Sequence, residues 1–408
     1  MRRHPRSLIL ALGALTAFGP ISLDVYLPSL PQLGADLGAS ESLTQFTMSA
    51  CMIGLAFGQL LWGPISDRYG RRMPLILAIA GFAITSVLCA VAPTIEVLIG
   101  VRIVQGLCGA AGMVIARAVV HDLFSGAEAV AAYSTLAAVM GAAPVLAPLV
   151  GGAVATFSDW RGVFITLAVI GLLLLAVAVF GVPETLEAQE RTTGGIGNDF
   201  GGIGAALSNG SFMLTAVTLG LASVALFSYL QMSPFVLQQQ YGLSAQGFAL
   251  VFAVNSIGIM AAANLNRRLA RRTPGRVVLR WSLSLATAAS VAVLLAGMLE
   301  SPLPWLLAPL FVAMSTHGIN NPSLTAIGLG RITRGAGSAS AVLGTFSMLL
   351  GALVPPLVSM FGVSATVLGA TMVGAFAVSL VLLLIGSARG HGGPSASRTG
   401  RAPGGRGS

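Results

Sequence analysis

The chain has 408 residues, of which 55% are hydrophobic and only 9% are charged. A soluble globular domain carries about 25% charged residues, so this composition excludes that class and indicates a membrane protein. The chain contains no lysine. This excludes an ATPase built on a Walker A loop and a pump with a retinal Schiff base, because both need that side chain.

Apolar stretches close to the ~20 residues that cross a bilayer recur along the chain and predict twelve transmembrane helices. They cover residues 8–28, 43–65, 73–93, 95–116, 130–155, 161–182, 212–234, 246–265, 278–299, 303–327, 336–360 and 363–386. An even number of spans places both termini on one side of the membrane. With that side in the cytoplasm, 20 of the 22 basic residues lie in or beside cytoplasmic segments, where basic residues are retained.

A polar, glycine-rich connection separates two sets of six predicted spans. We therefore expect an all-α membrane protein with an N-terminal bundle, a cytoplasmic linker, a C-terminal bundle and a disordered basic tail. These cover residues 1–182, 183–211, 212–386 and 387–408, respectively. The first and seventh spans begin 203 residues apart, near 8 and 211. Such a repeat is typical of parallel six-helix halves with a binding cavity at their interface.

Two ionisable residues lie deep in the predicted spans, Asp24 in the first and Arg102 in the fourth. At ~1.5 Å per residue they lie roughly 6 Å and 9 Å below the outer boundary, so they pair if their helices adjoin. Burial disfavours a charged carboxylate and a nearby arginine favours it, which makes Asp24 a candidate to bind and release a proton. The alternative is a structural helix-end residue held in a fixed pair with Arg102.

Charge is concentrated in the loop between the second and third spans, where a tight basic connection is expected on the cytoplasmic side. The residues of this conformational motif are Gly63, Asp67, Arg68, Gly70, Arg71 and Arg72. The second half repeats the basic residues at Arg267, Arg268, Arg271 and Arg272 but has no aspartate there. A weaker or different contact is therefore expected in the second half.

In the fourth span, Arg102, Gln105 and Met113 fall on one helical face and are candidates to line a cavity together. An interhelical hydrogen bond is the alternative for Gln105. The fifth span has two prolines four residues apart among small residues, which predicts a kinked, closely packed helix. Its motif residues are Gly141, Pro144, Pro148, Gly151 and Gly152.

Polar and aromatic residues within apolar spans are candidates for contacts with a moderately polar substrate. In addition to Gln105 and Met113, these are Tyr26, Tyr229, Gln231, Asn255, His317 and Asn320. The polar ones equally suit hydrogen bonds between helices, and a lone intramembrane histidine is commonly a packing residue. His121 and Asp122 are adjacent but have no further ligand at metal spacing, so no metal site is expected.

Several of these motifs resemble those of one family. The loop over residues 63–72 is similar to the loop between helices 2 and 3 of the major facilitator superfamily, in which glycines allow close helix approach and the charged residues latch the cytoplasmic face. Residues 23–31 and 229–238 resemble the bicyclomycin-resistance branch of its drug:proton antiporters. Residues 102–106 resemble the fourth-helix motif, whose arginine is associated with proton coupling. Residues 141–152 resemble the antiporter motif, found mainly in exporters.

This resemblance implies proton-coupled efflux of small amphiphilic antibiotics, phenicol- or bicyclomycin-like, across the inner (cytoplasmic) membrane by alternating access. The alternative is a proton-coupled importer, or an exporter, of a native small metabolite. A membrane-embedded enzyme would need a nucleophile and base arrangement such as Gly-x-Ser-x-Gly, which the sequence does not contain. We expect a drug substrate, protons and the lipid bilayer as partners, a monomer, no nucleic acid and no cofactor.

Overall fold

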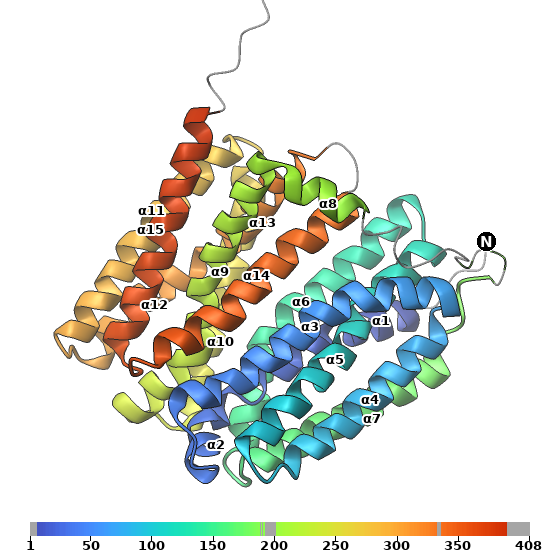
Figure 1. Cartoon of the computed structure of the whole chain (residues 1–408), viewed down its shortest axis with the longest axis horizontal. Coiled ribbons are helices and arrows are strands. Elements are labelled where there is room, and N and C mark those ends of the chain that lie inside the picture. The colour runs from blue at the N-terminus through green and yellow to red at the C-terminus, as the bar shows by residue number, and fades with distance from the viewer. Residues whose placement is uncertain (1–5, 188, 190, 192–200, 333–335, 390–408) are drawn as a thin grey trace, which may run out of the picture.

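The computed structural model describes residues 6–187, 189, 191, 201–332 and 336–389, and this part of the chain contains helices and no β-strand. Figure 1 shows two helical bundles side by side, the first in blue to green and the second in green to red. The expected all-α architecture of two bundles is confirmed. The predicted disordered tail beyond Arg389 lies outside the described residues.

Seven α-helices and one 3₁₀ turn make up the first half. They are α1 (Arg6–Asp24), η1 (Leu27–Ser29), α2 (Leu30–Asp36), α3 (Glu41–Tyr69), α4 (Arg72–Ala90), α5 (Ile95–Leu123), α6 (Gly126–Val154) and α7 (Trp160–Gly181). The short helix α2 continues the first predicted span beyond its expected end at Pro28, so α1, η1 and α2 together form one apolar crossing.

The second half contains the remaining helices and one π-helical turn. They are α8 (Gly201–Ser208), α9 (Gly210–Phe235), η3 (Val236–Gln240), α10 (Ala245–Leu269), α11 (Gly275–Met298), α12 (Leu303–Ser315), α13 (His317–Leu329), α14 (Ala336–Ser359) and α15 (Ala365–Arg389). Helix α8 lies within the predicted linker and packs on α9 and α14. The described part of that linker is therefore partly helical.

Eleven helices in the described part of the chain are long and apolar enough to cross a membrane. The predicted tenth span is instead split at Thr316 into α12 and α13, each of 13 residues. Backbone hydrogen bonds nevertheless continue across this point, from the Thr316 N–H to the Val312 carbonyl and from the Asn320 N–H to the Thr316 carbonyl, and the count of twelve crossings stays a prediction.

Many large apolar side chains lie on the outer surface of the bundles. Phe180 and Phe361 are 88% and 89% exposed, and Trp281 is 75% exposed. Water-soluble monomers rarely expose apolar surface on this scale, whereas lipid tails solvate it without penalty. The outer surface is therefore suited to a bilayer.

Polar side chains satisfy the first backbone N–H groups of five helices. Such caps matter in a membrane, because an unpaired backbone group has no water to bond with. In each case the side-chain oxygen accepts a hydrogen bond from an N–H two or three residues later. The capping residues are Ser40, Thr94, Asp159, Asn209 and Ser244.

Helices α3 and α5 approach each other so closely that glycine is required on both. A Cβ atom at Gly54 would overlap the carbonyl oxygen of Ile103, and one at Gly106 would overlap that of Cys51. Small residues that let helix backbones touch are the usual way in which membrane helices associate. This contact is the most extensive one between helices in the structure and fixes α5, which carries Arg102.

The two halves contact each other near the end of the molecule at which α3 begins and α14 ends, called here the distal end. Helix α3 packs on α14 and α6 packs on α10 across the junction. The hydroxyl of Ser42 donates to the Pro356 carbonyl at 2.7 Å, close to that end. In Figure 1, α3 and α14 lie together at the distal end and diverge toward the opposite end, where α1 begins and α15 ends. The halves are therefore closed at the distal end.

Replacing Gly106 by alanine tests the contact between α3 and α5. The added methyl group must push the α3 backbone away, so Gly106→Ala should destabilise the protein by about 1–3 kcal/mol and lower its melting temperature in detergent. Gly100→Ala on the same helix is the control, because a Cβ there meets nothing within 4 Å. Equal melting temperatures for the two variants would contradict the close contact.

Candidate functional site

Arg102 lies at the centre of the first half and is completely buried. Its Nε donates to the Thr47 carbonyl and its Nη1 to the Ser22 carbonyl, both at 3.3 Å. Its Nη1 also donates to Gln105 Oε1 at 2.7 Å. The guanidinium carbon lies 4.4 Å from the centre of the Tyr26 ring, a cation–π contact. Carbonyl dipoles and an aromatic face thus hold this cation inside α1, α3 and α5.

The predicted ion pair between Asp24 and Arg102 is absent from the structure. In the described part of the chain, both ion pairs within 4 Å belong to Arg71. Arg102 instead covers the ring of Tyr26, which lies in the turn that follows α1. The Asp24 side chain is 5% exposed and lies near Tyr229 of the second half. Asp24 therefore lies at the junction of the halves without a cationic partner.

Gln105 does not line a cavity with Arg102 and Met113, as one reading of the sequence proposed. Its amide nitrogen donates to Ser86 Oγ of α4 at 2.7 Å, and the side chain is fully buried. Met113 is 9% exposed and lies against α1 at Gly19. The alternative, an interhelical hydrogen bond at Gln105, is the arrangement that forms, because this face of α5 packs on α1 and α4.

Tyr26 is also enclosed within the first half. Its hydroxyl lies 3.2 Å from Thr47 Oγ1, its ring is covered by Arg102, and it is fully buried. Any substrate contact at Tyr26 would require this packing to open.

The candidate residues of α9 and α10 meet at the junction. Asn255 Nδ2 donates to the Tyr229 hydroxyl at 2.7 Å. The amide nitrogen of Gln231 donates to the Gly351 carbonyl of α14 at 2.9 Å, and its oxygen lies 3.3 Å from the Ser49 hydroxyl of α3. These three side chains are all buried. Together with Asp24 they form a cluster of polar side chains where the halves touch.

His317 and Asn320 lie on α13, just after the break in the predicted tenth span. Asn320 is buried, and its Nδ2 donates to Thr316 Oγ1 at 3.4 Å. The Nδ1 atom of His317 and the Oδ1 atom of Asn320 have no hydrogen-bond partner. Buried polar atoms of this kind are usually paired. These two atoms therefore remain available to a ligand, and a substrate contact at the two residues stays a prediction.

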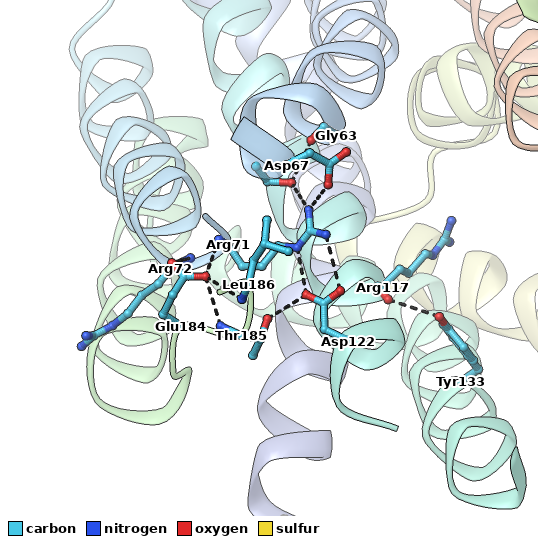
Figure 2. Close-up of polar contacts among 11 residues, drawn as sticks. Gly63, Asp67, Arg71, Arg72, Arg117, Asp122, Tyr133, Glu184, Thr185 and Leu186 are labelled. Atoms are coloured by element: carbon cyan, nitrogen blue, oxygen red, sulfur yellow. Dashed lines mark hydrogen bonds and ion pairs between the residues drawn. The ribbon is translucent and has the colours of Figure 1, made fainter. Parts of the chain in front are cut away.

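Arg71 is the centre of the charged loop between α3 and α4 (Figure 2). It pairs with Asp67 one turn earlier and, through Nε at 3.0 Å, with Asp122 of α5. Its Nη1 donates to Ser66 at 2.9 Å, and Thr185 Oγ1 donates to Asp122 at 2.8 Å. This latch ties α3, α4, α5 and the segment after α7 to one another.

The residue after α3 shows why this loop needs a glycine. Gly70 has φ +89°, and a Cβ there would overlap the carboxylate of Glu184. By contrast, a Cβ at Gly63 would meet only Val114, at 4.0 Å. The close helix approach implied for the loop glycines is therefore wrong at Gly63.

The two other arginines of the loop lie at its edge. Arg72 Nη2 donates to the Val179 carbonyl at 2.7 Å, whereas Arg68 is exposed and lies over the ring of Tyr69. In the second half, Asn266 Nδ2 donates to Ser323 Oγ at 3.2 Å where the first half has ion pairs. A weaker or different contact in the second loop stays a prediction.

Glu184 is a residue of the latch that the sequence did not reveal. Burial opposes its charge, but the backbone N–H groups of Arg71, Leu186, Arg72 and Thr185 donate to it and lower its pKa below the ordinary value. Two of these partners, Arg71 and Arg72, lie more than 110 positions away in the chain. Only its place after a predicted span, in a chain poor in acids, hinted at a role.

Helix α6 remains helical through both of its prolines. A Cβ at Gly151 would overlap the Val25 carbonyl oxygen, and one at Gly152 would lie 2.9 Å from Ala249 of the second half. The predicted close packing is therefore found at these two glycines. It is absent at Gly141, where a Cβ would meet nothing within 4 Å.

Two lipid-facing helical bundles that meet at one end around buried polar groups define a membrane carrier for small molecules. The chain belongs to the Major Facilitator Superfamily, whose sequence model matches residues 10–356. It is accordingly a multi-pass protein of the cytoplasmic membrane, and the predicted family is confirmed.

Relatives cover nearly the whole chain. It is 37% identical to an uncharacterized MFS-type transporter, YdgK, of Bacillus subtilis, over 90% of this chain and 92% of that protein. It is 28% identical to a bicyclomycin resistance protein homolog of Haemophilus influenzae, over 86% and 88% of the two chains. A bacterial homolog of the human lysosomal transporter Spinster has the same fold, with a TM-score of 0.71 at 15% identity over 95% of this chain and 96% of that one.

The pH dependence of stability tests the role of Glu184. Because its pKa is lowered in the folded state, the carboxylate stabilises the latch above the ordinary glutamate pKa of about 4.3, and this contribution is lost as pH falls through the lowered value. Glu184→Gln should therefore melt at a lower temperature than the parent protein at pH 7, with the gap closing below pH ~4.

Glu187→Gln, three residues further on, is the matched control, because the backbone N–H groups of Arg71 and Arg72 donate to Glu184 and not to Glu187. It should melt with the parent protein at every pH. A gap for Glu184→Gln that is absent at pH 7, or unchanged at low pH, would contradict the role assigned to Glu184.

Proposed function

We propose that this protein exports small amphiphilic antibiotics in exchange for protons. The proposal rests on one observation above others: a buried carboxyl group, Asp24, lies at the junction of the two halves with no cation paired to it. A carrier that alternates between two conformations opens and closes this junction, so the surroundings of Asp24 change in every cycle. The name of the bicyclomycin resistance relative supports a drug as the cargo.

Proton coupling follows from this change of surroundings. A carboxyl group that passes between a dry junction and a hydrated one changes its affinity for a proton. Arg102 stays within the first half, held by the carbonyls of Thr47 and Ser22. We infer that Arg102 acts as a fixed positive charge near the cycle's proton site and that Asp24 is the group that titrates.

The direction of the open side follows from the arrangement of basic residues. Arginines concentrate at the end of the bundles where α1 begins and α15 ends, which favours a cytoplasmic location for that end. Closure at the distal end would then correspond to a carrier that is closed to the outside. We infer a monomer whose two halves, joined by the linker over residues 183–211, rotate against each other.

Neutralising Asp24 tests the coupling. In everted membrane vesicles with an imposed proton gradient, Asp24→Asn should reduce uphill transport of a phenicol at least tenfold, because no proton can be exchanged. Transport down a drug gradient should continue. Glu96→Gln, a change at an exposed carboxyl group at the start of α5, should leave both activities intact. Uphill transport by Asp24→Asn at the parent rate would end the proposal.

A drug-susceptibility panel in an efflux-deficient host tests the cargo. Expression of the parent chain should raise the tolerated concentration of bicyclomycin or a phenicol several-fold, and Asp24→Asn should remove this protection. Protein levels in the membrane are measured for both. A well-expressed chain that protects against no compound would favour a native metabolite as the cargo.

A further inference from the structure

The prolines of α6 and α14 leave particular backbone carbonyls without a partner in their own helix. A helical carbonyl normally accepts from the N–H four residues later, and proline has no N–H. Pro148 therefore frees the carbonyl of Pro144, and Pro356 frees that of Ala352. In an apolar surrounding each freed carbonyl needs another donor.

In the structure, each freed carbonyl accepts a hydrogen bond from a serine of the opposite half. Ser256 of α10 donates to the Pro144 carbonyl at 3.2 Å, and Ser49 of α3 donates to the Ala352 carbonyl. Both serines are at least 95% buried. The backbone is thus completed across the junction instead of within the helix.

The two hydrogen bonds are formed by residues at matching positions in the two halves. Ser49 and Ser256 are 207 positions apart, and Pro148 and Pro356 are 208 apart, close to the spacing of the two halves. Each half therefore supplies one serine and one proline helix. Two bonds of the same design close the junction from its two sides, between α3 and α14 and between α6 and α10.

We propose that Ser49 and Ser256 are gate residues of the transport cycle, whose hydroxyls hold the distal end closed by bonding the carbonyls that proline has freed. When the distal end opens, water replaces the serines at both carbonyls. The closed state is dry and the open state is hydrated, so each carbonyl has a partner in both conformations. Both carbonyls therefore have a hydrogen-bond partner before and after the distal end opens, so opening leaves no buried acceptor unpaired.

Other contacts of Ser49 fit this role. Its hydroxyl also lies 3.4 Å from the Gln45 carbonyl of its own helix, a partner to which it can return when the gate opens. Its oxygen also lies 3.3 Å from Gln231 Oε1, but its single hydrogen is directed to the nearer Ala352 carbonyl. A hollow of about 530 Å³ lies at the distal end beside Ser42 and Ser359, two turns of α3 before Ser49.

The test measures the balance of closed and open distal ends directly. Spin labels at Phe157→Cys and Phe361→Cys, both on exposed residues at the distal end of opposite halves, report their separation in a chain whose three native cysteines are replaced. Ser49→Ala or Ser256→Ala should each raise the ratio of open to closed molecules roughly two- to tenfold, the effect of one hydrogen bond. The double variant should show the product of the two changes.

Ser290→Ala is the matched control. Ser290 is fully buried like Ser49, but its hydroxyl donates at 2.8 Å to the Ala286 carbonyl of its own helix, away from the junction. It should leave the ratio unchanged. If Ser49→Ala and Ser256→Ala shift the ratio no more than Ser290→Ala does, the two serines are not gate residues.

A second pair of variants tests the part played by proline. Alanine at position 148 supplies an N–H to the carbonyl of residue 144, so Pro148→Ala should raise the open fraction in the parent chain but add little to Ser256→Ala. Full additivity would mean that the proline acts through helix shape alone and would overturn the assignment. The readout needs neither drug nor proton transport, so its outcome is independent of the proposed cargo.

Discussion

The constraint that governs this structure is that a backbone in lipid must find its hydrogen-bond partners within the protein. Helices meet it internally, and side-chain caps such as Ser40 and Asp159 meet it at helix starts. The prolines of α6 and α14 lack an N–H and so leave particular carbonyls without a partner in their own helix. The freed acceptors at Pro144 and Ala352 are satisfied by the opposite half, so a local defect becomes a contact between the two bundles.

The buried charges are separated according to what surrounds them. Arg102 is enclosed in the first half, where carbonyls and the Tyr26 ring stabilise a permanent cation. Asp24 lies instead at the junction, next to the second half. A fixed pair would neutralise both groups throughout the cycle. Separation leaves the acid free to respond to opening, which is what a proton-coupled carrier requires.

The two ends of the molecule are held by different interactions. At the end opposite the junction, the latch around Arg71 joins helices of the first half with ion pairs, and in the second half Asn266 donates a hydrogen bond to Ser323. At the distal end the two halves contribute equivalent serines and prolines. Ion pairs suit the hydrated loops, while neutral hydrogen bonds suit a junction that must become dry.

Hydropathy and the placement of arginine were sufficient to determine the class and the helical architecture, because both act over segments of about 20 residues, whereas short motifs such as residues 63–72 pointed to the family. The broken span at Thr316 escaped this reasoning, since its two helices have the composition of one. Which face of each helix meets protein was decided only by packing, because lipid and protein interior are both apolar. Thus Gln105 donates a hydrogen bond to Ser86, and Arg102 bonds the Ser22 carbonyl and not Asp24. Glu184 likewise accepts a hydrogen bond from Arg71, in a loop distant in sequence.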